Sequence, residues 1–245
     1  MNNIRKISTH TLNFDVLKII ALLTMLLDHI GHVLLPYNID LRIIGRVTFP
    51  LFAFLLCYHL AKKNIFKKYI KRLFPFAVFS TLLLAPFDYQ IKGYFRFNIF
   101  WSFLIAILTL LIIEKISQEK VNTFLKFFVS ALALIFFGAC SYLCDYELTG
   151  FILIISLYGY FKTNKKIFIY TSLIDAALVN CKNLFLYPNI VIPLILVTFL
   201  TTLYLLRQSK HIRENQKRFL KPWWLFYLFY PVHFLILYLI KIYYF

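Results

Sequence analysis

Nine apolar runs divide this sequence, and each has a length suited to crossing a lipid bilayer. They lie at about residues 14–36, 43–61, 72–87, 97–113, 123–140, 148–161, 166–181, 188–206 and 223–240. A spanning helix needs about 20 mostly apolar residues, so the sixth and seventh runs are the shortest candidates. The chain is 61% hydrophobic with a mean hydropathy of +0.75, whereas soluble domains run at about 45–50%. We therefore expect one domain over residues 1–245, an all-α polytopic bundle of about nine transmembrane helices.

The positions of the basic residues predict how the chain is oriented. If the N-terminus is cytoplasmic, most Lys and Arg residues fall in the cytoplasmic segments. The outer side then holds only Arg42, Lys92, Arg96, Lys182 and Lys241. Cytoplasmic loops carry the excess of basic residues in membrane proteins, so we expect a cytoplasmic N-terminus and an outer C-terminus. The net charge of +17 is explained by this topology, and no nucleic-acid partner is expected.

The remaining compositional features indicate a multi-pass protein of the plasma membrane. Residues 1–13 are polar and basic, but the following run is too long for the apolar core of a signal peptide, so we expect a retained first span. The four cysteines form no Cys-x-x-Cys pair and lie mostly in apolar surroundings, where thiols behave as small hydrophobic groups. No metal site is expected, and the sequence does not indicate an oligomeric state.

Asp28 and His29 lie inside the first apolar run, where ionisable groups are costly and usually functional. His29 is about 22 Å along that helix, near its outer end, and Arg46 enters the second run at a similar depth. Asp28 and His29 point about 100° apart on a helix. We therefore predict that Asp28 pairs with Arg46 while His29 faces a cavity as a general base. The alternatives are a histidine at the headgroup level and a purely structural Arg46.

Other polar residues are candidates for binding substrates. Asp15 and Lys18 lie near the inner end of the first run and either line a cytoplasmic channel mouth or form an ordinary helix start with a snorkelling lysine. His233 is ten residues into the last run, too deep for snorkelling, and is predicted to line a cavity. Asn98, Asp145 and Tyr146 are further candidates near the outer face. The alternative for Asp145 is an ordinary solvated carboxylate of a loop. Asp175 in the seventh run has no obvious role.

Several motifs in series resemble those of a known family. They are Asp15-x-Leu17-Lys18-x-Ile20-Ala21, Met25-x-x-Asp28-His29-Ile30-Gly31, Arg42-x-Ile44-Gly45-Arg46-x-x-Phe49-Pro50-x-Phe52-Ala53-Phe54, Lys68-Tyr69-x-x-Arg72-Leu73, Asn98-Ile99, Asp145-Tyr146-x-x-x-Gly150 and Tyr230-Pro231-x-His233. Together they span almost the whole chain and resemble the TraX family of conjugal-transfer pilin acetylases.

This resemblance implies a membrane acyltransferase that takes acetyl from cytoplasmic acetyl-CoA and modifies an acceptor on the far side of the membrane. Asp28 and His29 match the signature pair of the family and are the expected catalytic residues. Arg46, His233, Asp145, Tyr146 and Asn98 are the expected acceptor-binding residues. Asp15 and Lys18 are expected to bind the cosubstrate acetyl-CoA. The acceptor is an amine or a hydroxyl of a pilin or another surface peptide or polymer.

Two functions of other classes also fit intramembrane Asp, Arg and His residues. A proton-coupled transporter or channel uses such groups as an ion pathway, although the sequence shows no internal repeat of the kind many transporters have. A non-catalytic assembly subunit of a surface structure would use them only to hold helices together.

Overall fold

The computed structural model describes residues 13–92, 96–181, 187–212 and 222–244. Within them all regular elements are helices, apart from one isolated bridge between Phe97 and Cys144. The helices are α1 (Phe14–Val33), α2 (Ile39–Gly45), α3 (Thr48–Lys63), α4 (Phe66–Lys92), α5 (Ile99–Gln118), α6 (Thr123–Ser141), α7 (Glu147–Thr163), α8 (Lys166–Leu178), α9 (Pro188–Gln208), the 3-10 turn η1 (Ser209–His211) and α10 (Trp224–Tyr244). The predicted all-α fold is confirmed.

Seven helical segments of the described chain are long and apolar enough to cross a membrane: α1, α2 with α3, α4, α5, α6, α9 and α10. Helices lie at all nine predicted positions, but α7 and α8 have only 17 and 13 residues. At 1.5 Å per residue they measure about 25 and 20 Å, short of the hydrocarbon core of about 30 Å. Of the nine predicted spans, seven therefore correspond to helical segments of spanning length, and the two at α7 and α8 correspond to helices too short for a full crossing.

The second predicted span is broken where it was expected to be continuous. α2 ends at Gly45, Arg46 and Val47 make a turn, and α3 starts at Thr48. Pro50 falls in the first turn of α3, where its missing N–H costs no helical hydrogen bond. The break leaves Arg46 at the junction of two helices, beside α1.

Asparagine residues define many of the helix ends. The side chains of Asn13, Asn38, Asn98 and Asn122 accept hydrogen bonds from the first backbone N–H groups of α1, α2, α5 and α6, as N-caps do. Asn64 and Asn164 end α3 and α7 in the left-handed conformation, with φ of 49° and 55°. The connections α3–α4 and α7–α8 are short because each helix stops sharply at such a residue.

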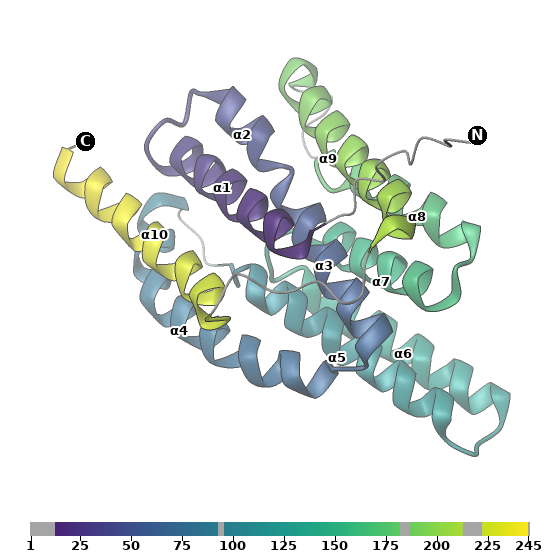
Figure 1. The fold of residues 1–245 in the computed structure, drawn as a ribbon. Helices are drawn as coiled ribbons and strands as arrows, with labels where there is room; N and C mark the ends of the chain where they lie inside the picture. Colours follow the sequence, from purple (N-terminus) through teal and green to yellow (C-terminus); the bar gives the residue numbers. More distant parts are fainter. Residues whose placement is uncertain (1–12, 93–95, 182–186, 213–221, 245) are drawn as a thin grey trace, which may run out of the picture.

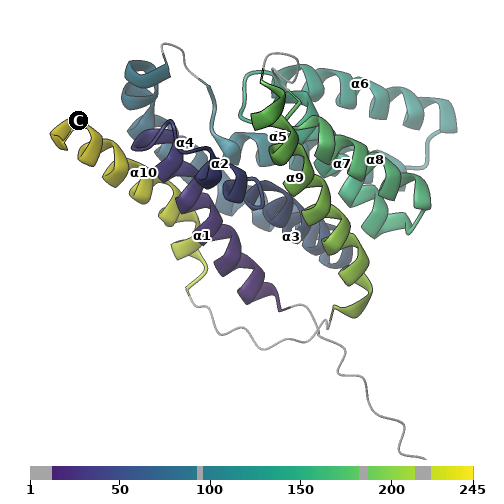
Figure 2. The ribbon, with the colours of Figure 1, turned by 90° about the horizontal axis from the view of Figure 1, so that it is seen from above.

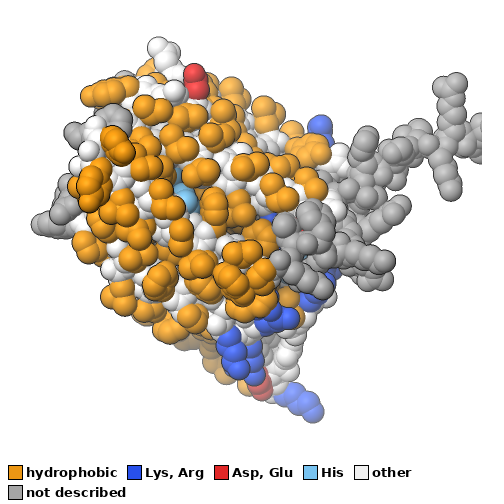
Figure 3. All heavy atoms as spheres, turned by 60° about the vertical axis from the view of Figure 1, so that its left-hand side comes forward, with side chains coloured by type: hydrophobic (Ala, Val, Ile, Leu, Met, Phe, Trp, Pro, Cys, Tyr) orange, Lys and Arg blue, Asp and Glu red, His pale blue; other side chains and the backbone are white. Residues whose placement is uncertain are grey.

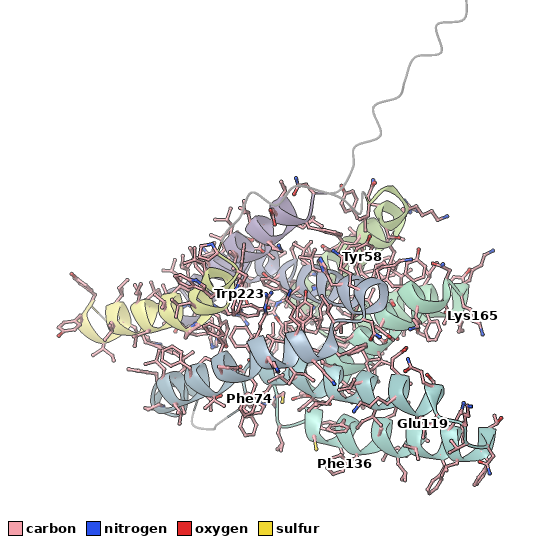
Figure 4. All side chains as sticks on the ribbon, turned by 60° about the horizontal axis from the view of Figure 1, so that its bottom comes forward. Tyr58, Phe74, Glu119, Phe136, Lys165 and Trp223 are labelled. Atoms are coloured by element: carbon pink, nitrogen blue, oxygen red, sulfur yellow. The ribbon has the colours of Figure 1, made fainter. Side chains whose placement is uncertain are left out.

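Helices α3 and α7 form the centre of the bundle (Figure 1). Most of α3 and α7 is buried, and the two helices pack against each other. Helices α1 and α9 also pack against α3, and helices α5 and α8 pack against α7. α6 packs on α5 and α7 but is mostly exposed, and its Phe136 points away from the bundle with 63% of its surface accessible (Figure 4). A short α7 is tolerated because protein, rather than lipid, surrounds it.

The outer surface is suited to a bilayer. In the view of Figure 3 hydrophobic side chains cover most of the visible face, while Lys and Arg side chains gather toward its lower and side margins. α1 and α10 run in the same direction and α9 runs in the opposite one (Figure 2). Glu119, after α5, and Lys165, before α8, lie at the same end of the molecule (Figure 4). This alternation agrees with the predicted topology, and which end faces the cytoplasm stays a prediction from the charges.

That prediction of orientation also uses seven further basic residues. Arg5, Lys6, Lys182, Arg213, Lys217, Arg218 and Lys221 lie outside the described residues.

Candidate functional site

A cavity of about 320 Å³ lies beside the Arg46 junction, and we call it the outer cavity. Its walls come from the second half of α1, the α2–α3 junction, the beginnings of α5 and α7, the end of α8 and the middle of α10. The polar and charged residues among its lining are Asp28, His29, His32, Arg42, Arg46, Thr48, Arg96, Asp145, Tyr146, Glu147, Thr149 and Tyr230. The sequence-predicted residues Asp28, His29, Arg46, Asp145 and Tyr146 are thus brought together, from segments far apart in the chain.

Asp28 is buried and faces two arginines. Its Oδ1 lies 3.5 Å from Nη2 of Arg46 and 2.9 Å from Nη1 of Arg42, which also donates to the Asp28 backbone carbonyl. The predicted Asp28–Arg46 pair is confirmed, but Arg42, which we placed in an outer loop, is the closer partner. The four-residue spacing of Arg42 and Arg46 could have indicated that both face the same side of a short helix.

Gly45 permits this arrangement. A Cβ atom at Gly45 would lie 2.2 Å from Cβ of Asp28, far inside van der Waals contact. The absence of a side chain therefore brings α2 close enough to α1 for both arginines to reach the carboxylate.

His29 is joined to His233 across α1 and α10. His29 Nδ1 and His233 Nε2 are 2.5 Å apart, and the two ring planes differ by only 4° with centroids 4.8 Å apart. These values describe two imidazoles in one plane, linked edge to edge through their nitrogens rather than stacked face to face. Nδ1 of His233 in turn lies 2.5 Å from the carbonyl oxygen of Phe229.

The hydrogen-bond chain fixes the position of the proton on each ring. A carbonyl oxygen only accepts, so Nδ1 of His233 carries hydrogen, and in the neutral imidazole its Nε2 is the acceptor. His29 must then donate from Nδ1, which leaves the lone pair of a neutral His29 on Nε2. The predicted cavity position of His29 is confirmed. His233 does not line the outer cavity, contrary to our expectation, and its Nε2 contacts His29 instead.

Tyr146 is held in an unusual conformation at the edge of the outer cavity. Its φ of 65° is left-handed, and its ring stacks on Phe49 with centroids 3.9 Å apart. A Cβ at Gly150 would come within 2.5 Å of Tyr146 Cβ, so this tight turn needs that glycine. Burial raises the pKa of Tyr146 to about 12. Such strain often occurs at functional sites.

Asn98 has a different task from the one we predicted. Its Oδ1 caps α5, and its Nδ2 donates to Ser80 Oγ at 2.8 Å and Thr81 Oγ1 at 3.1 Å on α4. The preceding residue, Phe97, exchanges backbone hydrogen bonds with the segment that carries Asp145. Asn98 therefore fastens α4 to α5 near the cavity and does not line it, because its amide is directed toward α4.

A second cavity, of about 170 Å³, lies toward the predicted cytoplasmic end, and we call it the inner cavity. Lys18, His59, Lys68 and Arg72 contribute its basic groups, and aromatic side chains make up much of the rest. Lys18 donates to Asp15 Oδ1 at 2.8 Å, so Asp15 supports Lys18 without lining the cavity itself. The predicted position of Lys18 at the cytoplasmic mouth agrees with this arrangement.

Two cation–π contacts and a buried histidine complete the inner cavity. The ammonium of Lys18 lies over Phe226, and the guanidinium of Arg72 lies 4.2 Å from the ring centre of Trp223. His59 is buried and its Nδ1 is 2.6 Å from the carbonyl oxygen of Leu55. We did not single out His59 from the sequence, although a histidine near the end of an apolar run is a visible signal.

The two cavities meet. Met25, Ile99 and Tyr230 line both of them, so a wall of three side chains separates the basic inner cavity from the outer cavity that contains His29. The Tyr230 ring lies 5.8 Å from the His29 ring. His29 lines the outer cavity, and the inner cavity ends on the other side of this wall.

Other candidate groups are structural. Asp175, which we left unassigned, accepts a hydrogen bond from Ser156 at 3.0 Å and links α8 to α7. Over residues 13–92, 96–181, 187–212 and 222–244, no cluster of three His, Cys, Asp or Glu side chains could hold a metal ion. The four cysteines, all in this part, are free thiols.

Comparison with known proteins identifies the family. Neither the curated proteins nor the solved structures contain a match to this chain. The family model described as TraX protein matches residues 13–241, nearly the whole chain. The match includes both cavities and every described residue discussed above. The chain therefore belongs to the TraX family.

Proposed function

We propose that this membrane protein transfers an acetyl group from cytoplasmic acetyl-CoA to an amine, or to a hydroxyl, of an acceptor at the outer face of the plasma membrane. The acceptor is a pilin or another surface peptide or polymer. The observation that carries the proposal is the contact of two cavities of different character beside His29. A group transfer across a membrane requires such a meeting point, because donor and acceptor come from opposite sides.

The inner cavity supports the binding of the donor. Lys68 and Arg72 attract phosphate groups electrostatically, and the aromatic lining suits the apolar parts of the pantetheine arm. The thioester at the end of that arm then reaches the wall formed by Met25, Ile99 and Tyr230. Family membership, which connects the chain to conjugation, supports the same reading.

In the proposed reaction His29 acts as the general base and carries out one proton transfer. As the acceptor nitrogen attacks the thioester carbonyl, Nε2 of His29 takes the proton that the nitrogen loses, and a C–N bond forms. The C–S bond then breaks and coenzyme A leaves as a thiolate, which receives the proton. Asp28 and Arg46 position the site and stabilise the charge that develops. Holding both reactants in a cavity removes much of the entropic barrier.

Replacement of His29 tests the proposal. The full-length chain, purified in lipid nanodiscs, is given acetyl-CoA, release of the coenzyme thiol is followed, and co-expressed surface peptides and polymers are examined by mass spectrometry. We expect His29→Ala to lower transfer by about 10²- to 10⁴-fold, the usual contribution of a general base. Phe136→Ala, an exposed position on α6, controls for expression and folding and should transfer normally.

Three outcomes would contradict the proposal. Retained acetylation in His29→Ala removes the catalytic assignment. Substrate flux into liposomes without acetyl-CoA indicates the transporter instead. Loss of thermal stability in Asp28→Asn and His29→Gln, with no acetyl transfer by the native protein, indicates an assembly subunit whose polar groups only hold helices together.

A further inference from the structure

Arg42 and Arg46 carry more positive charge and more donors than the single carboxylate between them can satisfy. Both guanidinium groups approach the same oxygen, Oδ1 of Asp28, and neither makes a two-pronged contact. Nε of Arg46 is buried and has no hydrogen-bond partner in the part of the chain that the structure describes. A buried donor that stays unsatisfied is unfavourable, so this nitrogen indicates a missing acceptor.

The other charges of the outer cavity do not complete this group. Arg96 forms an ion pair with Glu147, in which Nη2 and Oε1 are 2.5 Å apart. Asp145 also lines the cavity, and the ion pairs of Arg42 and Arg46 are both with Asp28. Asp28 and its two arginines therefore form a partly buried cluster with one excess positive charge.

We propose that the outer cavity binds its acceptor through an oxyanion, a carboxylate or a phosphate, held by Arg42 and Arg46. This inference rests on the proposed function and narrows the acceptor to molecules that carry an oxyanion near the amine or hydroxyl that is acetylated. An oxyanion supplies what the cluster lacks, because it brings the second negative charge and accepts from guanidinium donors that Asp28 leaves unused. Guanidinium groups match carboxylate and phosphate oxygens geometrically.

Exposure and volume agree with this assignment. The side chains of Arg42 and Arg46 are 30% and 14% exposed, and both line the outer cavity, so an entering group can reach them. The cavity volume of about 320 Å³ lies at the lower end of the range of small-molecule sites. It accommodates one sugar-sized or amino-acid-sized unit of a larger acceptor.

Calorimetric titration of the full-length protein in detergent tests the site without any acetyl transfer. The probes are methyl phosphate, propionate and methylammonium, each up to about 10 mM, which detects millimolar affinity. We expect the two anions to bind and methylammonium not to bind. Arg46→Gln should weaken anion binding by about tenfold or more, as loss of a charged hydrogen-bond partner does. Arg46→Lys, which retains the charge for folding, should weaken it several-fold.

The matched control is the double variant Lys162→Gln with Glu114→Gln, which removes an ion pair outside the outer cavity without changing the net charge of the protein. It should bind both anions as the native protein does. A stronger signal with methyl phosphate identifies a phosphate-bearing acceptor, and a stronger signal with propionate identifies a carboxylate. No heat with either anion, equal binding by Arg46→Gln, or equally strong binding of methylammonium would overturn the inference.

Failure of this inference differs from failure of the proposed function. His29→Ala keeps both arginines and should bind the anions normally while losing acetyl transfer. Anion binding by a native protein that transfers no acetyl group preserves the arginine site and removes the enzyme. Transfer that depends on His29, with no anion binding, supports the enzyme and removes the arginine site.

Discussion

At the scale of single residues, His233 has the most specific task. It accepts the Nδ1 hydrogen of His29 and is itself oriented by the Phe229 carbonyl, so it determines which nitrogen of His29 is basic. His233 is thus a positioning residue for the proposed reaction, comparable in logic to the partner that orients the histidine of a catalytic triad.

Replacing His233 should affect turnover more than donor binding. In His233→Gln we expect kcat to fall on the order of 10²-fold with little change in the KM for acetyl-CoA, because His233 does not line the inner cavity. Nitrogen NMR of labelled histidine should show His29 changing from a single tautomer, protonated at Nδ1, to a mixture. An unchanged tautomer together with unchanged kcat would contradict this role.

Part of this site could be predicted from the sequence, and the rest could not. Asp28, His29 and Arg46 could be predicted because charges inside apolar runs stand out. Arg42 could not be placed, since its role depends on α2 folding back against α1 after a turn. The His29–His233 contact joins residues 204 positions apart, and no local pattern determines which rings meet across such a distance.

At the scale of helices, the contact between α1 and α2 depends on glycine. We expect Gly45→Ala to destabilise the protein by about 1–3 kcal/mol, the usual cost of overpacking, because the new methyl group would overlap Asp28. Gly138→Ala is the matched control, since its nearest neighbour, Leu148 Cδ1, would be 3.4 Å away. Thermal unfolding in detergent measures both. Equal stability of the two variants would show that α2 can move away without cost.

The helix boundaries show why some elements were predictable and others not. Length and hydropathy located all nine predicted helices, but neither property could reveal that α2 ends at Gly45 and that α3 begins three residues later, at Thr48. The shortness of α7 and α8 was visible in the sequence. A short α7 is tolerated because it is buried among α3, α5 and α8, and this burial is a property of the assembled bundle.

At the scale of the whole molecule, the orientation can be tested directly. We predict that a cysteine introduced as Glu119→Cys, between α5 and α6, reacts with a membrane-impermeant maleimide only when the cytoplasmic side is accessible. Asn38→Cys, between α1 and α2, should react from the outside in intact cells, because the first span separates it from the N-terminus. Each is compared with the native background, in which four free thiols are present. The reverse pattern would invert the topology and place the basic inner cavity outside.

The wall of Met25, Ile99 and Tyr230 has a consequence for the permeability of the bilayer. A carrier that shuttles cargo must open one gate and then the other, and each opening risks leakage of protons. If transfer takes place at this wall, only a two-carbon fragment changes sides, and it does so while covalently attached first to one partner and then to the other. The bulky charged coenzyme stays where it is synthesised, and the cell's electrochemical gradients are not discharged.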